Sequence, residues 1–319
     1  MYSLVGKKVW IAGHRGMVGQ ALMRRLAFER CDILTINHAD LDCRDQAAVN
    51  DWVGANKPDV IYIAAARVGG IMDNANHPAE FFYDNMMIAA NIMHAAYLSG
   101  ASRVIFLGSS CIYPKHAAQP ISENALLSDV LEPTNEAYAL AKIGGVKMAD
   151  YYSRQYGCHY SAAMPCNLFG AGDTYDAQNS HVIPAMIMKA HAAKQAGQGE
   201  LVLWGTGSPL REFLWVDDLA DGLVFMTIYG EAPAMVNIGT GHEVTIKGLA
   251  NMICEIVGYT GKVVFDETKP DGTPRKVMDI SQMQSLGWEA PNLLAVNNDY
   301  DSYLRDKISL SYQDYLKII

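Results

Sequence analysis

Short apolar runs alternate along the chain with longer segments in which apolar residues recur every three or four positions. Brief apolar runs bounded by polar or glycine residues indicate buried strands, and the longer spacing indicates helices. The first half predicts strands over Val9–Ala12, Ile33–Ile36, Val60–Ala64, Arg103–Leu107 and Tyr160–Met164. It predicts helices over Met17–Glu29, Gln46–Asn56, Phe81–Leu98 and Asn135–Tyr156. Such alternation is typical of an α/β fold, a doubly wound parallel sheet with helices on both faces.

The pattern becomes less regular after Pro165. The elements expected beyond it are a polar loop over 167–179, a strand leading into a helix over Phe213–Met226, a short strand over Met235–Gly239, a helix over Ile246–Val257 and a strand over Lys262–Phe265. From Tyr303 to Ile319 the apolar spacing suits an amphipathic helix, which we expect to be loosely held. We expect a smaller, discontinuous C-terminal domain, with the chain returning to the large domain between its two segments.

Composition narrows the class of protein. Of 319 residues 50% are apolar, and 25 basic against 34 acidic residues give a net charge of −9. This charge argues against a general binder of nucleic acid or of anionic membranes. The six cysteines are scattered without a C-x-x-C pair, which favours a reduced cytosolic enzyme over a disulfide framework or a zinc site. With no signal peptide and no apolar run near the ~18 residues of a membrane span, we expect a cytoplasmic protein.

A glycine-rich segment follows the first predicted strand and opens the first predicted helix. It reads Gly13-His14-Arg15-Gly16-Met17-Val18-Gly19. Glycines at such a turn allow the backbone to approach a pyrophosphate, and the helix N-terminus supplies free N–H groups and a positive dipole end. The context within a strand–helix–strand unit therefore predicts a dinucleotide site of the Rossmann type.

The residues after the second strand bear on which dinucleotide binds. NAD-binding proteins usually place an acid there for the ribose 2′-OH, whereas this chain has Ile36-Asn37-His38, with Asp40 coming late. Arg15 could instead meet a 2′-phosphate with its planar guanidinium. We therefore favour NADP(H) over NAD. The alternative is that Arg15 is a solvated surface charge.

Three residues form a candidate group for hydride transfer. Tyr138 and Lys142 are four residues apart and share one helix face. A neighbouring ammonium favours the phenolate, which makes the tyrosine a usable acid or base at a carbonyl oxygen. Ser109 ends the fourth strand, at the edge of the sheet where such folds bind ligands. Cys111 is not needed for hydride transfer, so it indicates a second reaction at the same site, the alternative being a small buried apolar residue.

Several stretches together carry a resemblance. The chain resembles the extended short-chain dehydrogenase/reductases that act on nucleotide sugars, and in particular the GDP-L-fucose synthase group. The matching stretches are Gly13–Gly19, Val68-Gly69-Gly70-Ile71, Gly108-Ser109-Ser110-Cys111-Ile112-Tyr113-Pro114, Glu132-Pro133-Thr134-Asn135-Glu136, Asn179-Ser180-His181-Val182-Ile183-Pro184, Arg211-Glu212-Phe213 and Lys269-Pro270-Asp271-Gly272-Thr273-Pro274-Arg275-Lys276.

The resemblance implies roles for individual residues. Ser109, Tyr138 and Lys142 match the reductase group, and Cys111 and His181 match an acid/base pair for epimerisation. The implied cofactor contacts are Gly13, His14, Arg15, Gly16, Met17, Val18, Gly19, Leu41, Asp42, Leu107, Gly108, Ser109, Ser110, Lys142, Pro165, Cys166, Asn167, Leu168 and His181. The implied GDP-sugar contacts are Lys189, Trp204, Arg211 and Asp271. Trp204 could instead be core packing, and Arg211-Glu212 could be only a surface pair.

The implied activity is a 3,5-epimerisation followed by an NADPH-dependent 4-keto reduction, which converts GDP-4-keto-6-deoxy-D-mannose to GDP-L-fucose. The chemistry suits these residues, since a ketone at carbon 4 acidifies the hydrogens on carbons 3 and 5. A base and an acid on opposite faces of the ring are needed, and a thiol and an imidazole can both serve near neutral pH. The sequence leaves open which of Cys111 and His181 is the base. Tyr138 would protonate the alkoxide formed by hydride transfer.

The chain departs from the family at two places. Family members often carry arginine near the end of the second strand, where this chain has Ile36. An apparent insertion lies around Asn297–Ser309, to which we assign no function.

Other functions remain open at this stage. One is the same chemistry on a GDP-linked dideoxy sugar or heptose. Another is an NAD-dependent 4-epimerase or 4,6-dehydratase, although a dehydratase usually has an acid pair near positions 110 to 112. A cofactor-sensing regulator would not need Ser109, Tyr138 and Lys142 together.

The resemblance also predicts the organisation of the chain. We expect residues 1–166 and about 212–241 to bind NADP(H), and residues 167–211 and 242–319 to bind the GDP-sugar. It implies a homodimer formed through the helices over Phe81–Leu98 and Asn135–Tyr156.

Overall fold

A six-stranded parallel sheet forms the centre of the larger lobe in the computed structural model, which describes residues 1–176, 180–229, 232–269 and 271–319. Its strand order is β10-β5-β4-β3-β1-β2, and every neighbouring pair is parallel. The strands are β1 (Lys8–Ala12), β2 (Asp32–Leu34), β3 (Val60–Ile63), β4 (Arg103–Leu107), β5 (His159–Pro165) and β10 (Met235–Ile238).

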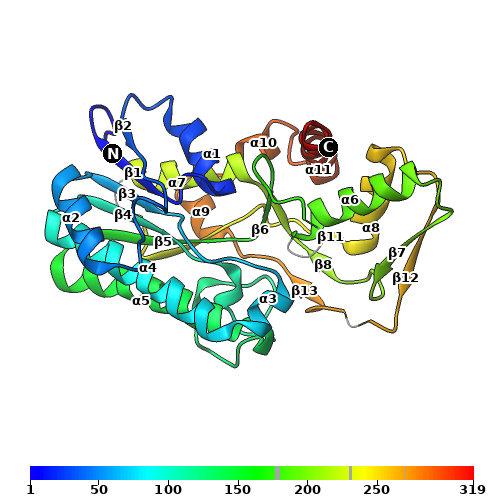
Figure 1. Cartoon of the computed structure of the whole chain (residues 1–319), viewed down its shortest axis with the longest axis horizontal. Helices are drawn as coiled ribbons and strands as arrows, with labels where there is room; N and C mark the ends of the chain where they lie inside the picture. Colours follow the sequence, from blue (N-terminus) through cyan, green and yellow to red (C-terminus); the bar gives the residue numbers. More distant parts are fainter. Residues whose placement is uncertain (177–179, 230–231, 270) are drawn as a thin grey trace.

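Helices cover both faces of this sheet (Figure 1). One face carries α1 (Met17–Leu26) packed against α7 (Val216–Tyr229), and the other carries α2 (Gln46–Asn56), α4 (Pro78–Ser99) and α5 (Glu136–Tyr156). Strands covered on both sides are mainly apolar, as Val9, Trp10 and Ile11 of β1 illustrate with no exposed surface. The predicted doubly wound parallel sheet of the Rossmann type is therefore confirmed.

Smaller sheets and helices make up the rest of the chain, at the right in Figure 1. The three-stranded sheet is β11 (Val244–Thr245), β8 (Leu210–Arg211) and β13 (Arg275–Lys276), and β7 (Glu200–Trp204) pairs with β12 (Lys262–Asp266). The helices there are α6 (Val182–Gln195) and α8 (Ile246–Val257). The remaining elements are α3 (Ile71–Asn76), α9 (Ser281–Ser285), α10 (Pro291–Leu294) and the 3₁₀ turns Ser110–Ile112, Glu123–Ala125 and Pro133–Asn135.

The segment predicted as a loop over 167–179 begins with a strand instead. β6 (Asn167–Phe169) pairs in parallel with β9 (Phe213–Trp215). The pairing joins residues far apart in the sequence and is too short to leave a local pattern. Asn179, which belongs to one of the family stretches, and Pro270, which belongs to another, lie outside the described residues.

The C-terminal helix is firmly anchored, so the prediction that it is loosely held is wrong. α11 (Tyr300–Ile318) buries Tyr303, Leu304 and Ile308. The Tyr303 hydroxyl accepts a hydrogen bond from the Trp215 backbone N–H at 2.7 Å and donates one to Asp218 Oδ2 at 2.9 Å. The apolar spacing could not reveal these polar contacts. In the part of the chain that the structure describes, no helix is both long and apolar enough to span a membrane.

Candidate active site

The glycine loop lies where β1 and β3 end side by side, at the point where the sheet's connections reverse direction. Gly13 adopts a φ of +89°, and a Cβ atom added there would lie 2.6 Å from the Ala65 nitrogen. A Cβ on Gly19 would lie 2.1 Å from the Gly13 carbonyl oxygen. These two positions therefore require glycine. Ligands of doubly wound sheets bind in the crevice at this reversal point.

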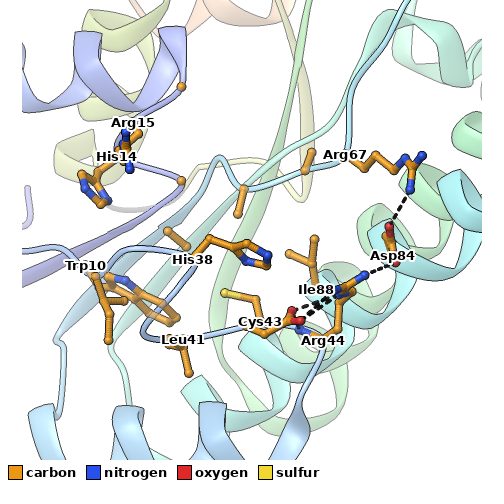
Figure 2. A pocket seen from close by; sticks show the side chains of 17 residues that line it. Trp10, His14, Arg15, His38, Leu41, Cys43, Arg44, Arg67, Asp84 and Ile88 are labelled. Atoms are coloured by element: carbon orange, nitrogen blue, oxygen red, sulfur yellow. Dashed lines mark hydrogen bonds and ion pairs between the residues drawn. The ribbon is translucent and has the colours of Figure 1, made fainter. Parts of the chain in front are cut away.

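A cavity of about 440 Å³ opens at this crevice (Figure 2). The predicted cofactor residues that line it are Gly13, His14, Arg15, Gly16, Leu41 and Asp42. Other lining residues had no predicted role: Trp10, Ile36, His38, Arg44, Ala65, Arg67 and Asp84. Ala65 and Arg67 follow β3. Because β3 lies beside β1, the strand order alone would have placed these two residues next to the glycine loop. Figure 2 shows the His38 ring projecting among these side chains.

The charged side chains around this cavity pair with one another and leave Arg15, in the glycine loop, available to an anion. Arg44 binds Asp42 at 2.7 Å and Asp84 at 3.0 Å, and Arg67 binds Asp84 at 3.3 Å. Hydrogen bonds from Arg44 lower the pKa of Asp42 to about 2. Arg15 makes no ion pair with any residue the structure describes. A 2′-phosphate entering here would therefore find a free guanidinium and acids already neutralised, which fits NADP(H).

The predicted reductase residues come together at the end of β4. Ser109 caps the turn Ser110–Ile112, and its Oγ accepts a hydrogen bond from the Cys111 N–H at 3.4 Å. Lys142 is buried and donates to the Leu107 carbonyl oxygen at 2.7 Å. Its Nζ lies 5.6 Å from the centre of the Tyr138 ring. The structure thus groups Ser109, Cys111, Tyr138 and Lys142, as the sequence predicts.

Burial dominates the electrostatics of this group. It raises the pKa of Tyr138 above its usual range, an effect that the Cys111 charge reinforces and a hydrogen bond with Ser109 opposes. It lowers the pKa of Lys142 to about 8. The Tyr138–Lys142 spacing predicts that the ammonium favours a phenolate, but desolvation of the buried phenol outweighs that effect. A phenol that keeps its proton at neutral pH is suited to donate it to an alkoxide.

The thiol of Cys111 has basic neighbours on two sides. Burial raises its pKa, whereas Lys276, the Ser109 hydroxyl and Lys142 pull it down. Lys276 ends β13. Burial lowers the pKa of its ammonium, and the nearby Cys111 and Cys166 offset only part of this effect. Lys276 belongs to one of the family stretches and had no predicted role. Its position beside the two cysteines appears only once β13 is placed in the fold.

His181 lies at the start of α6, with an exposed side chain. Its Nδ1 lies 3.3 Å from Asp173 Oδ1, and this contact raises the pKa of the imidazole. Asp173 is almost completely buried and was not predicted. Among the described residues, the structure joins His181 to Asp173 and not to the Ser109–Lys142 group.

The four predicted GDP-sugar residues gather between β7, β8 and α6. Lys189 Nζ lies 5.9 Å from the centre of the Trp204 ring, and Lys269 Nζ lies 5.8 Å from it. Asp271 accepts hydrogen bonds from the Thr206 N–H at 2.9 Å and the Thr206 hydroxyl at 2.7 Å.

Trp204 and Arg211 differ sharply in exposure. The Trp204 side chain is 68% exposed, which rules out core packing and leaves an open ring flanked by ammonium groups. Arg211 is half-buried, and burial lowers its pKa while Asp271 raises it. A flat ring with nearby cations suits a base and a diphosphate.

Glu212 is not part of a surface pair, because it is completely buried. Its carboxylate accepts hydrogen bonds from the N–H groups of Thr240, Gly241 and Met278. Burial raises the pKa of Glu212 to about 7, against the effect of these donors. The neighbouring segment Pro165–Leu168 was predicted to line the nicotinamide, and within it the Asn167 amide donates to the Glu212 carbonyl oxygen at 2.7 Å.

Comparison with known proteins agrees with this geometry. The model of the NAD dependent epimerase/dehydratase family matches residues 9–239, and the chain belongs to that family. Within it, the sequence is similar over nearly its whole length to GDP-L-fucose synthases. It is 49% identical to GDP-L-fucose synthase 1 of Arabidopsis thaliana, over 97% of this chain and 93% of that protein. It is 46% identical to the GDP-L-fucose synthase of Sinorhizobium fredii, over 95% of this chain and 98% of that protein.

A solved structure shows the same fold. A GDP-mannoheptose C4 reductase from Campylobacter jejuni with NADP bound superposes with a TM-score of 0.86. It is 30% identical in sequence, and the match covers 98% of both chains.

Proposed function

We propose that this protein is a bifunctional 3,5-epimerase and NADPH-dependent 4-keto reductase that converts GDP-4-keto-6-deoxy-D-mannose to GDP-L-fucose. The observation that carries the proposal is the grouping of Ser109, Tyr138 and Lys142 with Cys111 at the end of β4. Reduction needs the first three residues. The thiol beside them supplies the additional acid or base that epimerisation needs. The relatives that are 46% and 49% identical over nearly the whole chain are named GDP-L-fucose synthases.

In the reduction, bound NADPH supplies the hydride. Tyr138 donates its proton to the oxygen on carbon 4, because its raised pKa keeps the phenol protonated until an alkoxide forms. Ser109 orients that oxygen through its hydroxyl. Lys142 is held by the Leu107 carbonyl, next to the Tyr138 ring, and orients the nicotinamide ribose. The segment Pro165–Leu168 lines the nicotinamide side of the site.

In the epimerisation, Cys111 and His181 exchange protons at carbons 3 and 5 from opposite faces of the sugar. The thiol can ionise because Lys276 and Lys142 offset part of its desolvation. His181 is protonated more readily than an isolated imidazole because of Asp173. Lys189, Trp204, Arg211 and Asp271 hold the GDP part, with Trp204 facing the base and the cations facing the diphosphate.

The adenosine end of NADP(H) is held by the glycine loop and the cavity beside it. Gly13 and Gly16 bring the backbone to the pyrophosphate, and Arg15 meets the 2′-phosphate. Leu41 and Asp42 line the same end. On this assignment residues 1–166 and about 212–241 bind the cofactor, and residues 167–211 and 242–319 bind the GDP-sugar. The protein would work in the cytoplasm as a homodimer formed through α4 and α5.

The test is incubation with GDP-4-keto-6-deoxy-mannose and NADPH in deuterated water. We expect NADPH to be consumed and the product to carry deuterium at carbons 3 and 5. The absence of NADPH oxidation would refute the function. Deuterium at carbon 5 alone would instead favour a dideoxy-sugar substrate. Activity only with a GDP-heptose would favour a reductase of the kind that the Campylobacter jejuni structure is named for, a GDP-mannoheptose C4 reductase.

A further inference from the structure

Four connections that lead into, between or out of the smaller sheets meet at one residue. They run from β5 to β6, from β8 to β9, from β10 to β11, and from β13 toward α9. Glu212 lies in the second of these, between Arg211 of β8 and Phe213 of β9. It has no exposed surface.

The Glu212 carboxylate binds two of the other connections directly. Its Oε1 accepts hydrogen bonds from the Thr240 N–H at 2.5 Å and the Gly241 N–H at 2.8 Å, both in the connection after β10. Its Oε2 accepts a hydrogen bond from the Met278 N–H at 2.7 Å, in the connection after β13. A Cβ atom on Gly239 would lie only 2.2 Å from Oε1, so the backbone there closes tightly around the carboxylate.

The remaining connection meets the same residue from the cofactor side. The Asn167 amide donates to the Glu212 backbone oxygen at 2.7 Å, and the Cys166 thiol interacts with the Glu212 carboxylate. Cys166 and Asn167 belong to the segment assigned to the nicotinamide. Arg211, the residue before Glu212, is assigned to the GDP-sugar.

We propose that Glu212 is a positioning residue that fixes the nicotinamide segment relative to the GDP-sugar site, so that the ketone and the hydride donor meet in a reactive geometry. The proposal rests on the function proposed above. Proton exchange at carbons 3 and 5 needs the sugar to be placed only against Cys111 and His181. Hydride transfer also needs the nicotinamide to lie at a fixed distance and angle to the sugar ketone. A misplacement of about 1 Å can cost about 10²-fold in rate.

Glu212→Gln is the sharpest variant because it keeps the side chain's size. One oxygen can still accept from Thr240 and Gly241, but an amide NH₂ then faces the Met278 N–H, and that hydrogen bond is lost. We expect single-turnover hydride transfer to fall about 10²-fold, while deuterium exchange into the sugar falls less than about tenfold. NADPH affinity, followed by fluorescence quenching, should change less than about threefold, since Glu212 does not line the adenosine cavity.

Two further variants define the result. Thr240→Val removes the hydroxyl contacts to Glu212 Oε1 and to the His242 N–H, each at 3.2 Å, but leaves the backbone donors to Glu212. It should therefore keep hydride transfer close to that of the wild type. Glu212→Asp keeps the carboxyl group on a shorter side chain. The same two rates are measured on this variant if Glu212→Gln does not fold.

The outcomes separate the two proposals. Equal losses of exchange and hydride transfer, or no loss of either, would overturn the positioning role while leaving the function of the wild type intact. A wild-type protein that neither oxidises NADPH nor exchanges deuterium would overturn both.

Discussion

His181 Nδ1 lies 3.3 Å from Asp173 Oδ1 at the start of α6, and this contact raises the pKa of the imidazole. Asp173 is therefore expected to set the protonation state of the proposed epimerisation residue. A raised folded-state pKa means that the contact stabilises the fold fully below the pKa of an unfolded histidine, about 6.5. That contribution is lost as the pH rises through the folded-state pKa.

Asp173→Asn should lower the titration midpoint of His181, because the amide no longer favours the imidazolium. The measurement is the pH dependence of the His181 ring proton resonance by NMR, assigned with His181→Gln. The pH profile of deuterium exchange should move in the same direction. A midpoint unchanged in Asp173→Asn would show that the contact does not persist in solution.

Cys111→Ser should reduce deuterium exchange by at least about 10²-fold, because a serine hydroxyl ionises far less readily than a thiol. Reduction of a ketone that is already epimerised should fall much less, since Ser109, Tyr138 and Lys142 remain. Both steps can be followed by mass spectrometry and NADPH absorbance. Cys254→Ser, in α8, is the matched control. Equal loss of both steps would assign Cys111 to the binding pocket alone.

Arg15→Ala should weaken NADPH binding about tenfold or more, which is the loss of a charge-assisted hydrogen bond, and should leave NADH binding nearly unchanged. Fluorescence titration with each dinucleotide gives the ratio of the two affinities. Arg305→Ala removes an arginine on the surface of α11 and controls for a general change in charge. An unchanged preference for NADPH would remove Arg15 from the 2′-phosphate site.

Arg44→Leu tests the acids of the same cavity. It removes the partner that lowers the pKa of Asp42 to about 2, and leaves that carboxylate unpaired beside the adenosine ribose. An unpaired acid there repels a 2′-phosphate and accepts a hydrogen bond from a 2′-OH. The ratio of NADPH to NADH affinity should therefore fall about tenfold. A ratio equal to that of the wild type would show that Asp42 does not face the ribose.

The helices that the sequence predicted with the correct bounds, α2 and α8, are those with local capping signals at their starts. The α2 helix starts after Asp45, whose side chain accepts from the Ala48 N–H at 3.1 Å. The α8 helix starts after Thr245, which caps the Gly248 N–H at 3.0 Å, and ends at Gly258 in the left-handed conformation. These residues act within one turn, so their effect is visible in a short window of sequence.

The features missed from the sequence depend on residues far apart. β6 exists only because it pairs with β9, 46 residues later. The Arg44–Asp84 ion pair joins residues 40 positions apart, and Glu212 meets Met278 across 66 positions. The glycine loop and the Tyr138–Lys142 pair were predictable because glycine geometry and helical spacing fix them locally, and Ser109 because it follows a predicted strand. The partners that tune their charges become visible only in the fold.

Tyr303→Phe should destabilise the protein by about 1–3 kcal/mol, because it leaves the buried Trp215 N–H without its acceptor and removes a donor to Asp218. The measurement is the urea midpoint of unfolding at constant protein concentration. Tyr315→Phe, in the same helix, removes a hydroxyl that makes no hydrogen bond with the described residues and should change stability by less than about 0.5 kcal/mol.

The two phenylalanine variants also decide how α11 is held. If Tyr303→Phe lowers the midpoint and Tyr315→Phe does not, the helix is anchored through the start of α7, next to β9 and Glu212. Deuterium exchange of α11 backbone amides should then be faster in Tyr303→Phe alone. Equal midpoints for both variants and the wild type would mean that apolar packing of Leu304 and Ile308 holds the helix without the hydroxyl.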